Sequence, residues 1–171
     1  ARMEIVRAAT MLHDIGRSQA DAQGIDHAAY AARQAANILA DQPVSMVEAV
    51  IHAIAAHRFR SQPSPETVEA RVLFDADKLD AIGAIGVARA YAYGGAHGQR
   101  LWAPPEDVEL DRWLREGDDP DSHTPVHEFI VKLSRIKDML YTETGRAVAQ
   151  ERHTFMLAYF EQLNAEVRGA R

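Results

Sequence analysis

The sequence predicts an all-α protein, and two observations support this class. Apolar residues recur at helical spacing through most of the 171 residues, and no stretch alternates apolar with polar residues as a half-buried strand would. The apolar content of 47% is enough for one domain with a sizeable core. We therefore expect a single helical bundle over residues 1–171, with a long irregular loop near residues 94–125, where glycine, proline and aspartate are dense.

The first expected helix contains residues 5–12, whose apolar positions have helical spacing, and it ends near Gly16. This places His13 and Asp14 in the last turn, where the helix carries partial negative charge that favours a cation. An imidazole and a carboxylate suit a divalent ion. Taken alone, the pair is equally compatible with a packed histidine beside a polar helix-terminal residue.

Helical spacing also predicts the later helices, which loops of glycine, proline and polar residues separate. Asp26 is the expected N-cap of the first, and the capping box from Ser45 to Glu48 begins the second. The third is either one helix broken near Asp75 or two helices in succession. Residues 19–24 are expected to form a polar loop. The expected helices are 28–40, 45–57, 66–93, 126–141 and 143–167.

Three aspartates crowd what the pattern predicts to be the start of a helix. Asp77 and Asp80 are three residues apart and share a helix face. Acidic residues in a first turn complement the helix dipole, and this structural role is the one we expect for Asp75. Asp77 lies beside Leu79 and an apolar stripe, so its carboxylate borders the core and needs a cation or a hydrogen-bond donor.

These residues resemble the signature of the HD superfamily of metal-dependent phosphohydrolases, which is a histidine, then a His-Asp doublet, then a distant aspartate. His13 and Asp14 match the doublet, and Asp77 matches the final aspartate. The segment 74–95, with its Asp-Ala-Asp-Lys-Leu-Asp-Ala-Ile-Gly-Ala-Ile-Gly motif, resembles one branch of small bacterial HD hydrolases. Some members of that branch hydrolyse nucleoside triphosphates to the monophosphate and pyrophosphate.

The resemblance implies one HD-type phosphohydrolase domain and a set of metal ligands. His13, Asp14 and Asp77 would hold a divalent ion, which could be Mn, Co, Ni, Mg, Fe or Zn. His27 and His57 resemble the ligands of a second metal in binuclear HD proteins. The family's first histidine lies on a helix before the doublet, and we expect that the sequence lacks this N-terminal helix.

Further residues would act on a phosphorylated substrate, because the charge that develops on phosphoryl oxygens must be neutralised by cations. Lys78 directly follows Asp77, and Asp80 could orient a water molecule or hold a donor lysine. Alternatively, Lys78 is a surface lysine without a catalytic role, and Asp80 is a buried, hydrogen-bonded carboxylate. The expected catalytic residues are Asp80, Lys78 and His57, and the expected substrate-binding residues are Lys132, Arg146 and Arg17. His123 and His153 are expected to lie on the surface.

Composition limits the partners and the chemistry. The absence of cysteine excludes disulfides and thiolate metal ligands, and a net charge of −6 argues against broad electrostatic binding of nucleic acid. No apolar run approaches the roughly 20 residues that cross a bilayer, and no signal-peptide pattern is present. We expect a cytoplasmic protein that binds a small phosphorylated substrate, most directly a nucleotide, and no membrane. The oligomeric state is not predicted.

Three classes of function remain open. The leading one is a nucleotide phosphohydrolase that converts a nucleoside triphosphate to the monophosphate and pyrophosphate, with another HD phosphatase or phosphodiesterase, for a nucleoside monophosphate, a cyclic nucleotide or an alarmone, close behind it. The second is a di-iron oxygenase, which would require His27 and His57 to complete a second metal site. The third is a catalytically inert binding module, supported by the absent first histidine.

Overall fold

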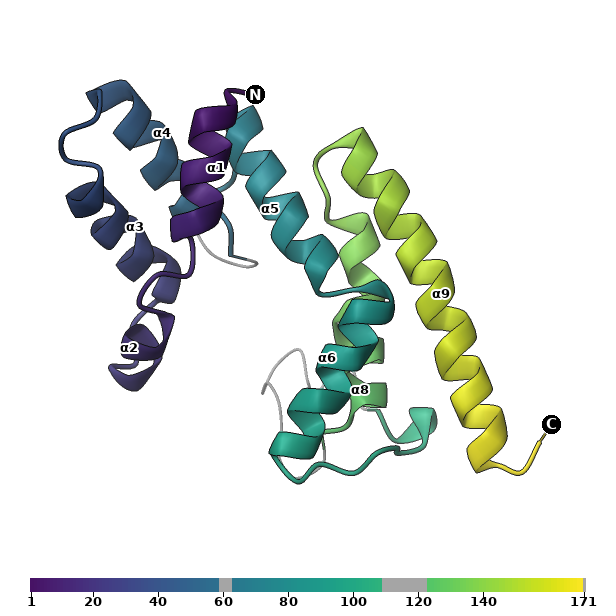
Figure 1. Cartoon of the computed structure of the whole chain (residues 1–171). Coiled ribbons are helices and arrows are strands. Elements are labelled where there is room, and N and C mark those ends of the chain that lie inside the picture. The colour runs from purple at the N-terminus through teal and green to yellow at the C-terminus, as the bar shows by residue number, and fades with distance from the viewer. Residues whose placement is uncertain (59–62, 109–122, 171) are drawn as a thin grey trace. The chain divides into compact units, whose positions relative to one another are not determined.

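Every regular element in the computed structural model is a helix within the residues that it describes, which are 1–58, 63–108 and 123–170. The all-α prediction is therefore confirmed for these residues (Figure 1). None of the described helices is both long and apolar enough to cross a membrane. The chain divides into two compact units, Ala1–Asp77 and Lys78–Arg171, and each is described by itself. The single domain over residues 1–171 stays a prediction.

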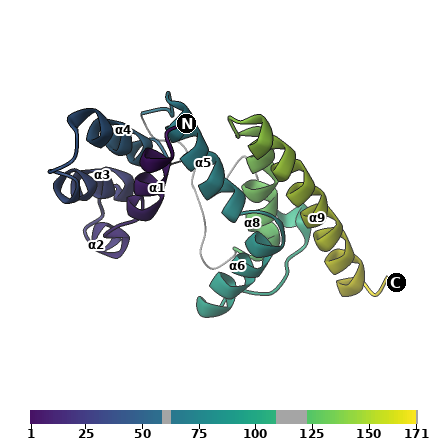
Figure 2. The same cartoon turned by 45° about the horizontal axis from the view of Figure 1, so that its top comes forward.

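The first unit is built from α1 (Met3–Leu12), α3 (His27–Ile38) and α4 (Val44–Ala55), with the short α2 (Arg17–Ala22) beside α3. Figures 1 and 2 show α3 and α4 lying side by side, with α1 against α4. The face of α3 that enters the core is made of alanines, so its backbone lies close to its neighbours. The buried core of this unit contains Ile5, Ala9, Ala31, Ala35, Val50, Ala53, Ile54 and Leu73.

A tight turn joins α1 to α2 and carries the His-Asp doublet. The sequence predicted the doublet in the last turn of α1. This is wrong, because α1 ends at Leu12 and the doublet follows it directly. The backbone N–H of Arg17 donates to the carbonyl of Asp14 at 3.1 Å and closes the turn. Gly16 has a φ of 72°, and a Cβ built there would lie 2.2 Å from Cε1 of Tyr30. Glycine is therefore required both by conformation and by space.

Two predicted boundaries in this unit are corrected by the structure. Residues 19–24 are mostly helical, because α2 begins directly after Gly16. Val44, after Pro43, is already helical, so Ser45 lies inside the first turn of α4 and the predicted capping box does not form. The predicted cap of α3 is confirmed, since a carboxylate oxygen of Asp26 accepts the backbone N–H of Ala29 at 2.9 Å.

The helix α5 (Val68–Asp80) corrects the expected role of Asp75. Thr67 accepts the backbone N–H of Ala70 through its hydroxyl, so the helix begins well before the aspartates. Asp75 lies two turns inside α5 and is only 3% exposed, so it does not start a helix. Of the two alternatives predicted for residues 66–93, two helices in succession is confirmed and a break near Asp75 is wrong, because α5 is continuous to Asp80 and α6 (Gly83–Ala96) follows it.

The second unit is organised around α9 (Glu143–Val167), whose bounds equal the predicted 143–167. The helix α6 and the 3-10 helix η2 (Leu133–Asp138) pack against it. The predicted helix 126–141 is divided into α8 (Pro125–Val131) and η2, because Lys132 leaves the helical conformation with a φ of −132°. The predicted irregular region, 94–125, is partly helical: α6 extends to Ala96, and η1 (Pro105–Asp107) is a short 3-10 helix. Residues 109–122 of this region lie outside the described residues.

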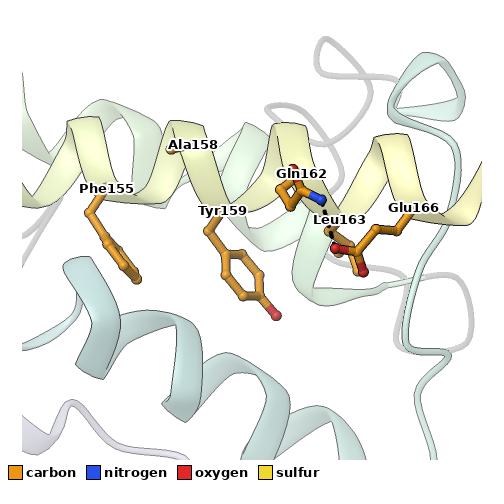
Figure 3. A pocket seen from close by; sticks show the side chains of 6 residues that line it. All are labelled: Phe155, Ala158, Tyr159, Gln162, Leu163 and Glu166. Carbon is orange, nitrogen blue, oxygen red and sulfur yellow. Dashed lines mark hydrogen bonds between the residues drawn. The ribbon is translucent and has the colours of Figure 1, made fainter. Parts of the chain in front are cut away.

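A pocket of about 350 Å³ lies along one face of α9 (Figure 3). A hydrogen bond of 2.8 Å joins Gln162 to Glu166 at one end of it. Glu166 is the only carboxylate in its lining, and no histidine lines it, so this pocket is not the predicted metal centre. Its lining residues are Phe155, Ala158, Tyr159, Gln162, Leu163 and Glu166.

The structure also corrects two histidines that were expected on the surface. His123 is largely buried, and its Nε2 lies 3.2 Å from a carboxylate oxygen of Glu128. His153 is 8% exposed, and its ring stacks on Phe129 with the ring centroids 6.4 Å apart. Nδ1 of His153 is buried and has no hydrogen-bond partner among the described residues. Burial, reinforced by the charge of Lys137, lowers the pKa of His153.

The turn at Gly16 gives a test with a matched control. Gly16→Ala adds the penalty of a left-handed residue, about 1–2 kcal/mol, to a clash with Tyr30. Gly24→Ala carries a similar φ, 65°, but its added Cβ meets nothing within 4 Å. We expect the Gly16 variant to lose clearly more free energy of unfolding than the Gly24 variant in urea titrations. Equal losses would mean that Tyr30 does not constrain the turn.

His153 predicts a pH dependence of stability. Its pKa is lower in the folded state than in the unfolded state, where it is about 6.5. As the pH falls through about 6.5, the unfolded chain therefore binds a proton that the folded chain does not, and stability decreases. We expect His153→Leu to remove part of this decrease when the free energy of unfolding is measured from pH 8 to pH 5. Identical pH profiles for the two proteins would contradict the assignment, and the difference at pH 8 reports packing alone.

Candidate metal centre

Three potential ligands converge in the first unit, from three different segments. Asp14 comes from the turn after α1, His27 is the first residue of α3, and His57 follows α4. One ligand atom from each lies within 4.8 Å of the others. Oδ1 of Asp14 is 3.8 Å from Nε2 of His27 and 3.9 Å from Nε2 of His57. This is the only group of three or more such ligand atoms among the described residues.

Backbone carbonyls fix the orientation of two histidine rings at this centre. Nδ1 of His57 donates to the carbonyl of Ile54 at 2.6 Å, and Nδ1 of His13 donates to the carbonyl of Thr10 at 2.8 Å. Because a carbonyl only accepts, the proton of the neutral ring is on Nδ1 and the lone pair is on Nε2. In metal sites, a hydrogen bond from the ring nitrogen that does not bind the metal orients the histidine ligand in this way.

His27 and its neighbours form the charged rim of the centre. Its ring lies 5.5 Å from that of His57, centroid to centroid, and the side chain is 13% exposed. Arg58 donates to a carboxylate oxygen of Asp26, the residue that caps α3. Burial, with the positive charges of Arg17 and Arg58, lowers the pKa of His27, although Asp14 and Asp26 oppose this shift. The neutral, ligating form of His27 is therefore favoured.

The carboxylate of Asp14 is held in its charged form. Burial acts to raise its pKa, but the hydrogen bond and charge of Arg17, together with His13 and His27, keep the pKa of Asp14 below its ordinary value. Nη1 of Arg17 donates to Oδ2 at 2.9 Å. Oδ1 is buried and has no hydrogen-bond partner among the described residues. A buried carboxylate oxygen that faces two imidazoles and lacks a donor calls for a cation.

The donor set and its spacing fit a divalent ion. Separations of 3.8 and 3.9 Å are too long for hydrogen bonds. Two bonds of ~2.1 Å each, from one ion to nitrogen and oxygen ligands, span at most about 4.2 Å. Small rotations of the three side chains would thus allow one ion to contact all of them. Imidazole nitrogen with carboxylate oxygen suits Zn, Fe, Ni, Co or Mn.

The structure brings together only some of the residues predicted as metal ligands. Nε2 of His13 lies 3.8 Å from Oδ2 of Asp14, and its ring lies 5.2 Å from that of His57, centroid to centroid, but His13 is not part of the three-residue group. Asp77 is half-buried near the end of α5 and is not part of the three-residue group. His27 and His57, expected for a second metal, are thus nearest to Oδ1 of Asp14. The metal role of Asp77 stays a prediction.

The remaining predicted residues have local partners in the second unit. Asp80 is exposed and forms an ion pair with Arg89 at 2.6 Å. Lys132 pairs with Glu128, also at 2.6 Å. The guanidinium of Arg146 donates to the backbone carbonyls of Leu140 and Tyr141, and Lys78 is half-buried. The catalytic roles of Asp80 and Lys78, and the substrate-binding roles of Lys132 and Arg146, stay predictions.

The ion pair of Asp26 and Arg58, next to His27 and His57 in the sequence, was not predicted. The order Asp26-His27 and His57-Arg58 was a usable signal, since a charged residue adjacent to each ligand in sequence is held near it. The two segments are 32 residues apart, and the sequence alone does not indicate that they approach each other.

Comparison with known proteins finds similarity to one family in the first part of the chain. Residues 1–82 match a family model described as HD domain. The uncharacterized protein YpgQ of Bacillus subtilis is 38% identical over 124 residues, which are 70% of this chain and 52% of YpgQ. The match thus spans about half the length of that relative.

Solved structures give the same relationship. The structure of an HD-superfamily hydrolase from Bacillus thuringiensis is similar with a TM-score of 0.68 and 29% identity, over 96% of this chain and 73% of the other. The structure of Bacillus subtilis YpgQ in complex with ADP is similar with a TM-score of 0.62 and 28% identity, over 96% of this chain and 88% of the other. The residues that match the family model, 1–82, include Asp14, His27 and His57.

The centre predicts a loss of metal affinity on removal of one charge. Asp14→Asn keeps the shape of the side chain but removes the negative charge between the histidines, so we expect Mn²⁺ to bind at least about tenfold more weakly. Asp21→Asn removes an exposed carboxylate that also lies near Arg17, at 4.0 Å, and serves as the matched control. Isothermal titration calorimetry measures the Mn²⁺ affinity of the wild type and of the two variants. Unchanged affinity in Asp14→Asn would refute the ligand assignment.

Proposed function

Because residues 1–82 of this chain match a family model described as HD domain, we propose that the protein is a divalent-metal-dependent phosphohydrolase that acts on nucleotides. The reaction that we propose is hydrolysis of a nucleoside triphosphate to the monophosphate and pyrophosphate. The observation that carries the proposal is the convergence of Asp14, His27 and His57, in which one buried carboxylate oxygen of Asp14 has no hydrogen-bond partner in the described part of the chain.

A divalent ion held by these residues supplies a Lewis acid for a phosphoryl oxygen and lowers the pKa of a bound water. The side chains around this position are oriented and protonated in a way that suits metal binding. His13 and His57 keep their Nδ1 protons on backbone carbonyls and so present Nε2. His27, whose pKa is lowered by burial, stays neutral near neutral pH and can ligate. Asp77, the match to the family's final aspartate, is proposed as a further ligand.

Positive charge near the centre supports a phosphorylated substrate. Arg17 and Arg58 flank the ligands in the first unit, and each is placed beside a carboxylate that a phosphate could replace as partner. Guanidinium groups bind phosphate oxygens through two parallel hydrogen bonds, which suits the transfer of a charged group. Lys78, Lys132 and Arg146 are proposed as additional phosphate-binding residues, and Asp80 as a group that orients water.

The nucleotide part of the proposal is supported by a relative. YpgQ, to which this chain is similar, has a structure in complex with ADP. That ligand contains a base, a ribose and two phosphates, so it has the phosphoanhydride that a triphosphate substrate would share. We propose that the substrate of this protein is a ribo- or deoxyribonucleoside triphosphate.

A second candidate deserves one measurement. A di-iron oxygenase would need two histidines besides the doublet, and His27 and His57 both lie beside Asp14. Metal counting and oxygen consumption with Fe-loaded protein separate this candidate from the phosphohydrolase. Two irons per chain with oxygen uptake would favour it.

The function is tested by product analysis. Protein loaded with Mn²⁺ is incubated with each nucleoside and deoxynucleoside triphosphate, and pyrophosphate is resolved from phosphate. We expect pyrophosphate, since attack at the α-phosphorus releases the two terminal phosphates together. Asp77→Ala should abolish turnover and weaken Mn²⁺ binding with helix content unchanged, whereas Asp41→Ala, at an exposed aspartate, should change neither.

Each outcome of this assay has a defined meaning. Release of phosphate alone would replace the proposal with a phosphatase. No turnover with any ion or nucleotide would reject it. Full activity in Asp77→Ala would remove that residue from the ligand set and leave the three-residue group to act alone.

A further inference from the structure

The two oxygens of the Asp14 carboxylate face different groups. Oδ1 faces Nε2 of His27 and Nε2 of His57 and has no hydrogen-bond partner among the described residues. Oδ2 accepts a hydrogen bond from Nη1 of Arg17 at 2.9 Å, and Nε2 of His13 is 3.8 Å from it. One oxygen thus lies in a place suited to a metal ion, while the other already holds a cation of the protein.

We infer that Arg17 is an internal cation that competes with the divalent ion for the charge of Asp14 and so limits the affinity of the centre for metal. The inference rests on the metal centre proposed above and concerns a residue that the sequence assigned only to the substrate. A guanidinium on Oδ2 withdraws negative charge from the whole carboxylate, because the two oxygens share it. It also repels a second cation close by.

The position of Arg17 follows from the turn and is not an accident of a long side chain. Arg17 is the first residue of α2, directly after the left-handed Gly16. Its backbone N–H donates to the carbonyl of Asp14 at 3.1 Å, while its side chain donates to the carboxylate of the same residue. Both the backbone and the side chain of Arg17 therefore hold it beside Asp14, and a side chain in place of Gly16, between them, would collide with Tyr30.

Charge balance at the rim points in the same direction. Asp14 pairs with Arg17, and Asp26 pairs with Arg58, so the two carboxylates nearest to His27 are both matched by arginines. A divalent ion then enters a centre whose fixed charges already cancel. Removal of one arginine leaves one negative charge in excess and should strengthen binding of the ion.

The expected size of the effect is modest, because the side chain of Arg17 is 54% exposed and water screens the pair. We expect Arg17→Gln to bind Mn²⁺ roughly two- to tenfold more tightly than the wild type. Arg17→Lys keeps the charge, so its affinity should lie closer to that of the wild type. Arg7→Gln removes an exposed arginine from α1 and is the matched control for net charge.

The experiment is calorimetric titration of the full chain with Mn²⁺ alone, after removal of metal by a chelator. Tighter binding in Arg17→Gln, with Arg7→Gln unchanged, supports the inference. Unchanged or weaker binding in Arg17→Gln overturns it, and so does equal tightening in both variants, which would reflect net charge alone. Absence of Mn²⁺ binding in the wild type would overturn the metal centre as well, so the two failures are distinguishable. Thermal unfolding in chelator checks that the variants remain folded.

A second readout uses the wild type itself. The NMR signal of the Arg17 side-chain Nε–H, assigned by its absence in Arg17→Gln, should move when diamagnetic Zn²⁺ is added, because the ion weakens the hydrogen bond that Nη1 of the same guanidinium donates to Oδ2 of Asp14. The signal of Arg7 should stay in place. A stationary Arg17 signal at saturating Zn²⁺ would contradict competition for the carboxylate.

Discussion

The carboxylate of Asp14 is the point on which the first unit converges. The turn after α1 carries it, α3 and α4 bring His27 and His57 to one of its oxygens, and Arg17 holds the other. The alanine-rich contact between α3 and α4 allows this approach, because small side chains let the helix backbones lie close. The turn that carries the carboxylate contains Gly16, where an added Cβ would lie 2.2 Å from Cε1 of Tyr30.

Electrostatics and geometry cooperate at this point. Burial opposes charge on Asp14, yet the adjacent arginine keeps its pKa low, so the carboxylate is available as a ligand. Burial and the same arginine also keep His27 neutral, as its lowered pKa requires. One guanidinium therefore prepares the ligands and, in our inference, restrains the ion that they bind.

The sequence predicted much of the candidate centre by residue type but little of its arrangement. The His-Asp doublet and the two later histidines were identified, because adjacent hard ligands at a helix end are uncommon in packing and because they match a family signature. Their distribution over the two oxygens of Asp14 was not predictable, since it depends on contacts between segments far apart in the chain. Asp75 was misjudged for a different reason: the predicted start of the helix was misplaced, and an acidic residue in a helix interior then cannot be told from one in a first turn.

Helical periodicity by itself determined the fold class, the extent of α9 and the capped start of α3, because each depends on residues within one or two turns of one another. The resemblance to the HD superfamily was also readable from the doublet and the later aspartate, and residues 1–82 match a family model described as HD domain. Only the tertiary structure decided that His153 is buried, that α2 replaces a loop, and which oxygen of Asp14 meets which histidine. These features depend on burial and on distances between separate segments, and no periodicity within a segment encodes them.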